Sequence, residues 1–509
     1  MRIAGKTVKE YYESGCSERE PYLRRARDVA SLTLPALMPP DGWAAGQTLG
    51  TPFQSMGSRG VSSLASKLLL ALFPPNQSFA RLELDAGAEQ ALQGGGSSRS
   101  EVEASLAGIE RSILREVEAV SLRPHLHEVM KHLIACGNVC LYIPPEDSDE
   151  GRVKVTHLDR FIVKRDPAGN ILGLVIKESI SAELLPESLK HIVTTKPDSA
   201  ESATFDIYTA AIRDGKKFHV WQEVEGEVVP DSEGVFAPKD LPWLVLRMEP
   251  VSGQSYGYGY AASVLGDLGS LEGLWQGLVE SSAVAAKTLF LVNPTSSTRI
   301  EELVNAPNGG FVTGNPDDVV TLKVEKAADM QISFQAIEHL QKSLGFAFLL
   351  NQSVQRSGER VTAEEIRFLA QELEDVLAGT YSLLSQELQL RLVHLILKRL
   401  ESKGIPKLKG IARPSIITGL EALGRGHDLM KLDTFVQGAG QTLGPDGLNR
   451  HLNAGEYLRR RATAVGLNSE GLIRSDEEIQ EMDQQQAQAQ LTQTATPEVI
   501  RQAGKAMTG

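Results

Sequence analysis

The longest uninterrupted helical pattern of the chain follows Thr362 and constrains the fold more than any other feature. Thr362 and Glu365 match a capping box, and Val361 and Ile366 match the hydrophobic staple that flanks it. Apolar residues then recur at helical spacing, and no proline follows until Pro406. About 40 residues at a rise of 1.5 Å each would form a helix about 60 Å long. Because such a helix needs packing partners along its length, we expect neighbouring subunits to supply some of them.

A polar segment with two arginines, 351–361, lies between this helix and an earlier helical pattern at 327–350. Another proline-free helical pattern spans 262–291. Between these two earlier patterns, 292–326 combines several prolines and glycines with short alternating strands such as VVTLKVE. The sequence therefore predicts two helices around a compact insert, then a loop, then the long helix.

The remaining regions predict a mainly helical α+β protein. Residues 22–35 and 58–75 read as amphipathic helices, each ended by proline. Period-two patterns between Asp-Gly and Pro breaks predict a β-rich module at about 151–250. From about 410 the pattern is helical again, and the glutamine-rich end predicts a polar helix or a mobile tail. A length of 509 residues allows roughly three domains.

Charge and cysteine content exclude several classes of protein. With 52 basic and 65 acidic residues, the formal net charge is -13, which is unlike a protein that holds nucleic acid on a basic face. Three cysteines predict no disulfide framework and indicate a reducing cytosol. The first residues lack the apolar stretch of a signal peptide, and no apolar run reaches the ~18–20 residues of a membrane span. We expect a soluble intracellular product.

Histidine and cysteine residues between His125 and Cys140 form the only cluster with metal-like spacing. His132, Cys136 and Cys140 recur every four residues, so one continuous helix would place them on the same face. Alternatively, Gly137 ends a buried helix and a short strand follows, which would separate Cys140 from the others. The glycine favours the second interpretation, and we predict no metal.

Other motifs do not indicate an active site. GYGYAA at 257–262 matches the dinucleotide fingerprint GxGxxA, but a long loop precedes it and no βαβ unit follows. We interpret it as a joint that feeds a helix. Gly5-Lys6-Thr7 lacks the leading glycine of a phosphate loop, and HExxH does not occur. The sequence predicts neither an enzyme nor a cofactor.

Several stretches together resemble the portal proteins, or head-to-tail connectors, of short-tailed bacteriophages, especially those that carry their own single-subunit RNA polymerase. They are GSRGVSSLASKLLLALFP, ACGNVCLYIP, RDPAGNILGLVIK, SYGYGYAASVLGDLGSLEGLWQ, GFVTGNPDDV and FAFLLNQSVQRSGERVTAEEIRFLAQELEDVLAG. The resemblance covers nearly the whole chain and is weakest after about Gly440.

The resemblance implies a portal fold that assembles as a ring, typically of twelve subunits, at one capsid vertex. It implies the following parts: wing, 1–261; first stem helix, 262–291; clip, 292–326; second stem helix, 327–350; channel loop, 351–361; long wing helix, 362–409; crown, 410–470; polar helix or tail, 471–509.

The same resemblance implies a function in which double-stranded DNA passes through the ring during packaging and ejection. The implied partners are other copies of the chain, the terminase large subunit, a tail adaptor or tail tube protein, major capsid and scaffolding proteins, and internal core proteins. The protein would be made in the host cytoplasm and reside in the virion.

Two groups of residues are candidates for these contacts. The channel loop would present Asn351, Gln352, Gln355, Arg356, Glu359 and Arg360 to DNA. The clip would present Arg299, Glu301, Glu302, Asn315, Asp317 and Asp318 to the motor and the tail adaptor. The alternative function is an oligomeric scaffold or adaptor without DNA passage, which composition and the long helix also permit; an enzyme is a more distant alternative.

Overall fold

The computed structural model describes residues 3–461 except 4, 45, 75–77, 86–98, 147–151, 185–188, 190–203, 286–288, 296–297, 323–326, 351–372, 374–376, 378, 407, 409–410, 417–432, 445–446, 448–449, 453, 456 and 459–460. The chain divides into two compact units. One lies within Met1–Pro74 and Ser78–Ile416, and the other within Pro75–Gln77 and Ile417–Gly509.

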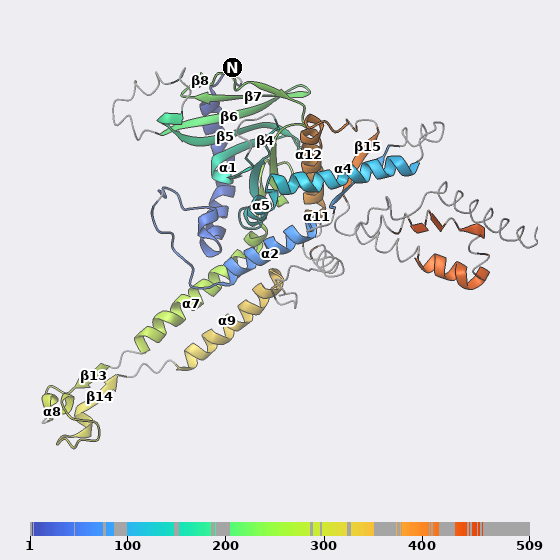
Figure 1. Ribbon diagram of the computed structural model, residues 1–509. Helices are drawn as coiled ribbons and strands as arrows, with labels where there is room; N and C mark the ends of the chain where they lie inside the picture. The colour runs from blue at the N-terminus through green and yellow to red at the C-terminus, as the bar shows by residue number, and fades with distance from the viewer. Residues whose placement is uncertain are drawn as a thin grey trace, which may run out of the picture. The chain divides into compact units, whose positions relative to one another are not determined.

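Helices near the N-terminus form the core of the first unit (Figure 1). They are α1 (Val8–Leu32), α2 (Met56–Leu72), α4 (Arg99–Ala119) and α5 (Leu122–Cys136). Helix α5 packs against both α1 and α2. The stripe expected on α2 is confirmed, because Val61, Leu64, Leu68 and Leu72 are all fully buried.

Helix α1 begins earlier than the sequence pattern predicts. A capping box between Thr7 and Glu10 starts it, so the expected start at residue 22 is wrong. Pro21 lies inside the helix and removes one backbone hydrogen bond. Burial of Tyr22 and Leu23 just after this proline stabilises the continuous helix.

The part of the chain between 154 and 250 consists largely of antiparallel strands. A sheet has the order β4 (Phe161–Arg165), β5 (Ile171–Ser181), β6 (Thr204–Asp214), β7 (Lys217–Val224) and β8 (Glu227–Val228), and β9 (Gly234–Phe236) also pairs with β7. A second sheet has the order β10 (Trp243–Arg247), β2 (Asn138–Tyr142) and β3 (Lys154–His157). Helix α1 contacts the larger sheet, where buried Arg19 donates to the carbonyl oxygens of Asp159 (2.7 Å) and Phe161 (3.1 Å).

The long helix is described from Gly379 onward. It runs through α11 (Gly379–Leu384), a π-helical segment (Ser385–Leu390) and α12 (Arg391–Ser402). Lys403 closes the last turn and Gly404 follows with φ +99°, so the helix ends before the expected residue 409. Within the π-helical segment, the fully buried Gln389 donates to the carbonyl oxygen of Leu72 at 2.6 Å.

Ion pairs to the buried Glu116 and to Glu146 hold the end of this helix. Arg399 Nε lies 3.0 Å from Glu116 Oε1, and Lys403 Nζ lies 2.7 Å from Glu116 Oε2. Glu146 accepts a second contact from each cation, at 2.6 Å and 3.4 Å. Helix α12 is thereby connected to α4 and to the segment that follows β2.

The chain after residue 410 does not turn directly into a helical region. Strand β15 (Ala412–Ile416) pairs with β1 (Ala80–Leu84) and belongs to the first unit. The expected helical pattern from about residue 410 is therefore wrong for this strand. In the second unit, residues 433–444 are helical, and Asp433 accepts a hydrogen bond of 2.7 Å from Tyr457.

Candidate functional site

Two helices and a hairpin connect the regions on which the functional prediction rests. Helix α7 (Leu265–Ala285) and helix α9 (Ala327–Ala347) lie side by side (Figure 1). The expected single helix over 262–291 is wrong at both ends. Residues 260–264 form a 3₁₀ turn, η5 (Tyr260–Val264), and the apolar run after α7 forms strand β13 (Leu289–Val292).

Burial divides each helix of the pair into a packed face and an exposed face. Leu268 and Leu271 of α7 are fully buried. Ile337 and Leu344 of α9 are at most 1% exposed. Phe334, which shares the predicted stripe, is 49% exposed. The apolar pattern therefore fixes where the helices pack and leaves a second set of side chains uncovered.

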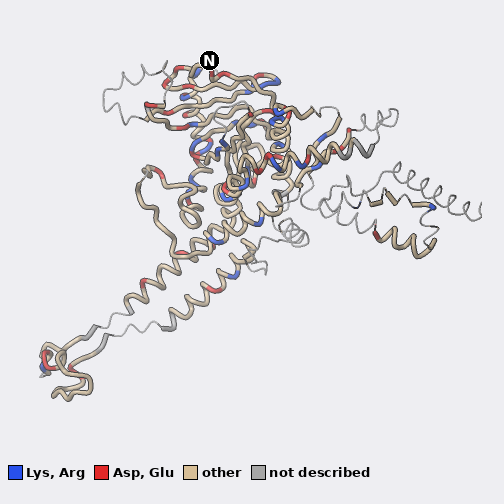
Figure 2. The backbone as a smooth tube through the Cα atoms, in the orientation of Figure 1, with Lys and Arg blue, Asp and Glu red and all other residues tan. Residues whose placement is uncertain are grey.

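The charges of the pair are predominantly acidic. Helix α7 carries Asp267, Glu272 and Glu280 and has neither Lys nor Arg (Figure 2). Glu272 accepts from the backbone N–H groups of Phe53 and Gln54 at 2.8 and 3.1 Å, which attaches the segment before α2 to this helix. Glu280 is exposed and accepts from Gln276 at 2.9 Å.

The insert between the helices is a two-stranded hairpin. Strand β13 pairs antiparallel with β14 (Val319–Leu322), from Leu289 opposite Leu322 to Val292 opposite Val319. Between the strands lie a short helix, α8 (Ile300–Val304), and a 3₁₀ turn at Pro316–Asp318. The strands begin before the expected clip boundary of 292, because the apolar residues 289–291 pair instead of continuing α7.

A buried hydrogen-bond network organises the hairpin loop. The Thr298 hydroxyl donates to Asp318 Oδ2 at 2.7 Å and accepts from the N–H of Asn315 at 3.0 Å. The N–H of Asn293 donates to the carbonyl oxygen of Asp318 at 3.0 Å. Asp318, predicted as a contact residue, is 8% exposed, so its carboxylate holds the loop together.

The other predicted clip residues lie on the surface. Arg299, Glu301, Glu302, Asn315 and Asp317 are all exposed. Arg299 Nη1 lies 3.0 Å from Glu302 Oε1, with both side chains largely in solvent. Asn315 Oδ1 accepts from the N–H of Asp317 at 3.2 Å, which starts the 3₁₀ turn.

The hairpin also exposes apolar side chains that the sequence analysis does not single out. They are Leu291, Ile300, Leu303, Val304, Phe311 and Val320. Exposed apolar residues gathered on one small element indicate an interaction surface. For Ile300, Leu303 and Val304 the signal in the sequence is their apolar spacing within the five-residue helix α8, in which no residue is buried.

All the predicted channel-loop residues, Asn351, Gln352, Gln355, Arg356, Glu359 and Arg360, lie outside the described residues. The chain that leads into this loop is firmly attached. Phe348 is fully buried against Gly60, and Tyr260 donates to the carbonyl oxygen of Ala347 at 2.8 Å. Lys67 Nζ donates to the carbonyl oxygen of Leu349 at 2.5 Å. These contacts hold the last described residues before position 351 in place.

The structure confirms the interpretation of the histidine and cysteine segment as a helix, a glycine stop and a strand. Gly137 ends α5 with φ +80°, and Cys140 lies on β2. Burial, followed by the neighbouring His157, lowers the pKa of His132 to about 3, and burial raises the pKa of Cys136 to about 12. Among the described residues, no group of His, Cys, Asp or Glu has the geometry of a metal site.

The GYGYAA segment supplies close backbone contacts. Gly257 and Tyr258 form β12, and Gly259 leads into the 3₁₀ turn that precedes α7. A Cβ atom on Gly259 would lie 2.6 Å from the carbonyl oxygen of Ala135. Glycine is needed here so that two backbones can approach, and the interpretation as a joint before a helix is confirmed.

No helix among the described residues combines the length and the apolar character that crossing a bilayer requires.

Comparison with known proteins identifies relatives over nearly the full length. The family model described as bacteriophage head to tail connecting protein matches residues 5–473. The portal protein of Escherichia phage T7 is 39% identical over 491 residues, which cover 95% of this chain and 91% of that protein. The portal protein of Enterobacteria phage T3 is 37% identical, with coverage of 94% and 90%, and that of Enterobacteria phage SP6 is 28% identical, with coverage of 95% and 93%.

Proposed function

The chain belongs to the bacteriophage head-to-tail connecting proteins, and we propose that its copies close into a ring whose axial channel passes double-stranded DNA at one vertex of the capsid. The near full-length match with portal proteins carries this proposal. The resemblance stated from the sequence is thereby confirmed at the level of the family. The number of subunits, typically twelve in this family, belongs to the proposal.

Within such a ring we assign α7 and α9 to the stem, 289–322 to the clip and 351–361 to the channel loop. We keep 1–261 and the long helix to Ser402 as the wing, and we place the crown after Ile416. The acidic side chains of α7 support the assignment of the stem, because a channel that moves DNA must not hold it. Carboxylates repel the negatively charged phosphates of DNA, and salt screens that repulsion beyond about 8 Å.

The channel loop would supply weak contacts to the DNA. Arg356 and Arg360 would form positive rings that meet the phosphate backbone without reading its sequence, and Glu359 would limit their strength. Asn351, Gln352 and Gln355 would add neutral hydrogen-bonding groups. The attachments at Phe348 and Leu349 support this proposal, because they would hold the base of the loop while the duplex moves.

The clip would bind the packaging motor first and the tail later. Its exposed apolar residues provide an interface core, and Arg299, Glu301, Glu302, Asn315 and Asp317 provide a polar rim. We propose the terminase large subunit and a tail adaptor as the partners, with capsid, scaffolding and core proteins contacting other parts of the ring. The protein would be made in the host cytoplasm and reside at the portal vertex of the virion, without an enzymatic role of its own.

Electron microscopy of the purified protein tests ring formation. Closed rings with an axial opening are expected, and particles without an opening would refute the proposal in favour of a scaffold.

Packaging with purified rings tests the role of the loop. Arg356→Ala combined with Arg360→Ala should leave rings intact and reduce the amount of DNA packaged or retained. Arg24→Ala, at an exposed arginine of α1, is the matched control. Packaging by the double variant that equals the control would exclude the proposed contacts.

A charge exchange tests the clip without disturbing its fold. Combining Arg299→Glu with Glu302→Arg preserves the ion pair within the loop and reverses the charges that a partner meets. Binding of the motor subunit should weaken several-fold, because rim charges influence association. Unchanged binding would place the motor elsewhere.

A further inference from the structure

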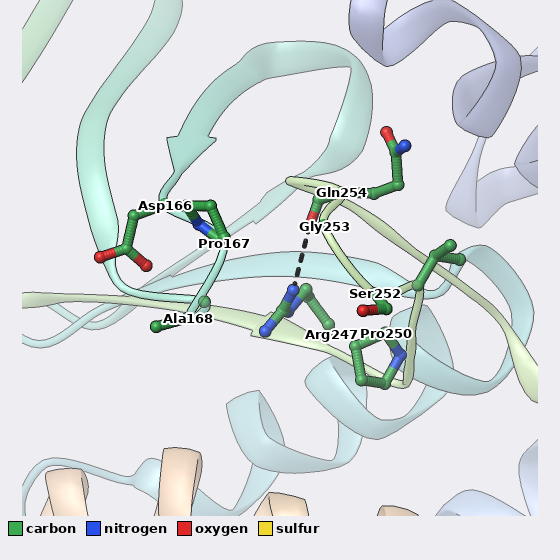
Figure 3. A pocket seen from close by; sticks show the side chains of 10 residues that line it. Asp166, Pro167, Ala168, Arg247, Pro250, Ser252, Gly253 and Gln254 are labelled. Atoms are coloured by element: carbon green, nitrogen blue, oxygen red, sulfur yellow. Dashed lines mark hydrogen bonds between the residues drawn. The ribbon is translucent and has the colours of Figure 1, made fainter.

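A pocket of the first unit has a buried arginine in its wall (Figure 3). The turn 166–169 between β4 and β5 forms one side, and the loop 250–254 forms the other. The cavity has a volume of about 290 Å³. This space is large enough for a small ion with part of its hydration shell.

Arg247, in the wall of this pocket, is 7% exposed and has unused hydrogen-bonding capacity. Its Nη1 donates to the carbonyl oxygen of Gln254 at 3.3 Å, as Figure 3 shows, and its Nη2 lies 3.5 Å from Glu387 Oε1. Its Nε has no hydrogen-bond partner among the described residues. A guanidinium carries five N–H donors, and buried donors are normally satisfied.

The charges around Arg247 are unbalanced. Arg165 lies beside it and donates to the carbonyl oxygens of Gly169 at 2.8 Å and Val245 at 2.7 Å. Burial, followed by the positive charge of Arg247, lowers the pKa of Arg165 to about 10. Arg391 is partly buried and donates to the carbonyl oxygen of Leu241 at 3.5 Å. Carbonyl groups satisfy donors and leave the positive charge uncompensated.

The acidic groups nearby do not restore the balance. Glu387 faces Arg247 and acts on the pKa values of Arg165 and Arg391. Asp240 also acts on Arg391, but it forms ion pairs with His394 at 3.0 Å and Lys398 at 2.9 Å. Among the described residues, the buried Arg247 and the partly buried Arg165 and Arg391 therefore depend mainly on one carboxylate. Buried charges in proteins are normally paired.

Asp166, in the wall of the pocket, is already engaged. Its Oδ1 accepts from the N–H of Asn170 at 2.8 Å, and its Oδ2 accepts from Asn170 Nδ2 at 2.9 Å. In Figure 3 the Asp166 carboxylate points away from the Arg247 guanidinium. Glu387, for its part, lies in the π-helical segment, and π-helical turns occur frequently at functional sites.

We propose that this pocket binds an oxyanion through the Arg247 guanidinium, with the Ser252 hydroxyl in the same wall as a second donor. The oxyanion is either a free phosphate or a carboxylate from a second copy of the chain. The site is independent of the channel and of the proposed function, because it rests on the charges of the wing alone.

Unfolding of the full chain in urea, in sodium phosphate and in sodium chloride of equal ionic strength, tests the site. At phosphate ten times its dissociation constant, the unfolding equilibrium constant should fall about elevenfold. Arg247→Gln should abolish this response, and Arg24→Gln should keep it. Glu387→Gln removes the carboxylate that competes with phosphate for Arg247, so the stabilisation should appear at a several-fold lower phosphate concentration. This variant tests the site if Arg247→Gln does not fold.

A second arm distinguishes the two sources. If a carboxylate of another copy fills the pocket, phosphate has no effect, and the urea midpoint rises more steeply with protein concentration in the wild type and in Arg24→Gln than in Arg247→Gln, whose remaining rise reports ring assembly alone. In that case Glu387→Gln makes the rise steeper. If neither phosphate nor protein concentration acts through Arg247, the proposal is wrong.

Discussion

Replacing Gly137 with alanine should be among the most destabilising changes in the first unit. Gly137 ends α5 with its N–H donated to the carbonyl oxygens of His132 and Leu133, both at 3.0 Å. Its φ of +80° is unfavourable for any residue with a Cβ. A Cβ at this position would also overlap the backbone of Tyr258 and Gly259.

Two independent terms set the magnitude. The left-handed backbone costs about 1–2 kcal/mol for alanine. Forcing an atom into a packed backbone contact costs about 1–3 kcal/mol more. We therefore expect Gly137→Ala to reduce the free energy of unfolding by about 2–5 kcal/mol. Urea unfolding followed by circular dichroism measures this change, with the slope against urea checked for constancy.

Two matched variants separate the terms. Gly215 has φ +58° and nothing within 4 Å of its Cβ position, so Gly215→Ala reports the backbone term alone. Gly259 has an ordinary φ, and a Cβ added there would lie 2.6 Å from the carbonyl oxygen of Ala135. Gly259→Ala therefore reports the cost of the close contact alone. If Gly137→Ala costs no more than Gly215→Ala, the close approach of the two backbones is refuted.

Three further variants test other contacts. Burial raises the pKa of Glu116, but hydrogen bonds donated by Lys403 and Arg399 outweigh it and hold the pKa below its usual value. Stability from this group is therefore present above pH ~4.5 and lost as pH falls below it. In urea unfolding, Glu116→Gln should lower the free energy of unfolding at pH 7 by about 3–5 kcal/mol, and it should lose less stability than the wild type between pH 5 and 3. Thr298→Val leaves the buried Asp318 carboxylate without the hydroxyl that donates to it and should speed proteolysis within 293–318. The control Thr313→Val, at an exposed position, should not; equal cleavage rates in the two variants would argue against the hydrogen-bond network. Arg299→Ala should change stability by less than about 0.5 kcal/mol, and a larger loss in thermal unfolding would show that its ion pair is structural.

Local patterns predicted the helices well where burial follows helical spacing. The α2 stripe and the glycine stop after α5 are of this kind, because every residue involved lies within a few turns of its partners. The end of α7 was misjudged because Leu289 to Val292 continue an apolar pattern. Only pairing with Val319–Leu322, beyond the whole insert, makes them a strand.

The segment between β13 and β14, which we propose as the clip, shows that local patterns also miss long-range pairing at the candidate site. The exposure of Arg299 and Glu302 is predicted by the local pattern of charges on a short helix. The structural role of Asp318 depends on Thr298, twenty positions earlier, and no local pattern contains that pairing. The arginines in and around the pocket of Figure 3 are also brought together only by the tertiary fold; they are Arg165, Arg247 and Arg391.

The pairing of β1 with β15 has a consequence for how the chain is made. The strand at Ala80–Leu84 leaves the ribosome long before its partner at Ala412–Ile416 exists. At about 5–20 residues per second, the wait lasts tens of seconds. During that time Leu82 lacks the neighbours that β15 supplies, and a prematurely terminated polypeptide never acquires them. The pairing of β1 with β15 makes completion of the first unit conditional on nearly complete translation, so a fragment without β15 would remain incompletely folded.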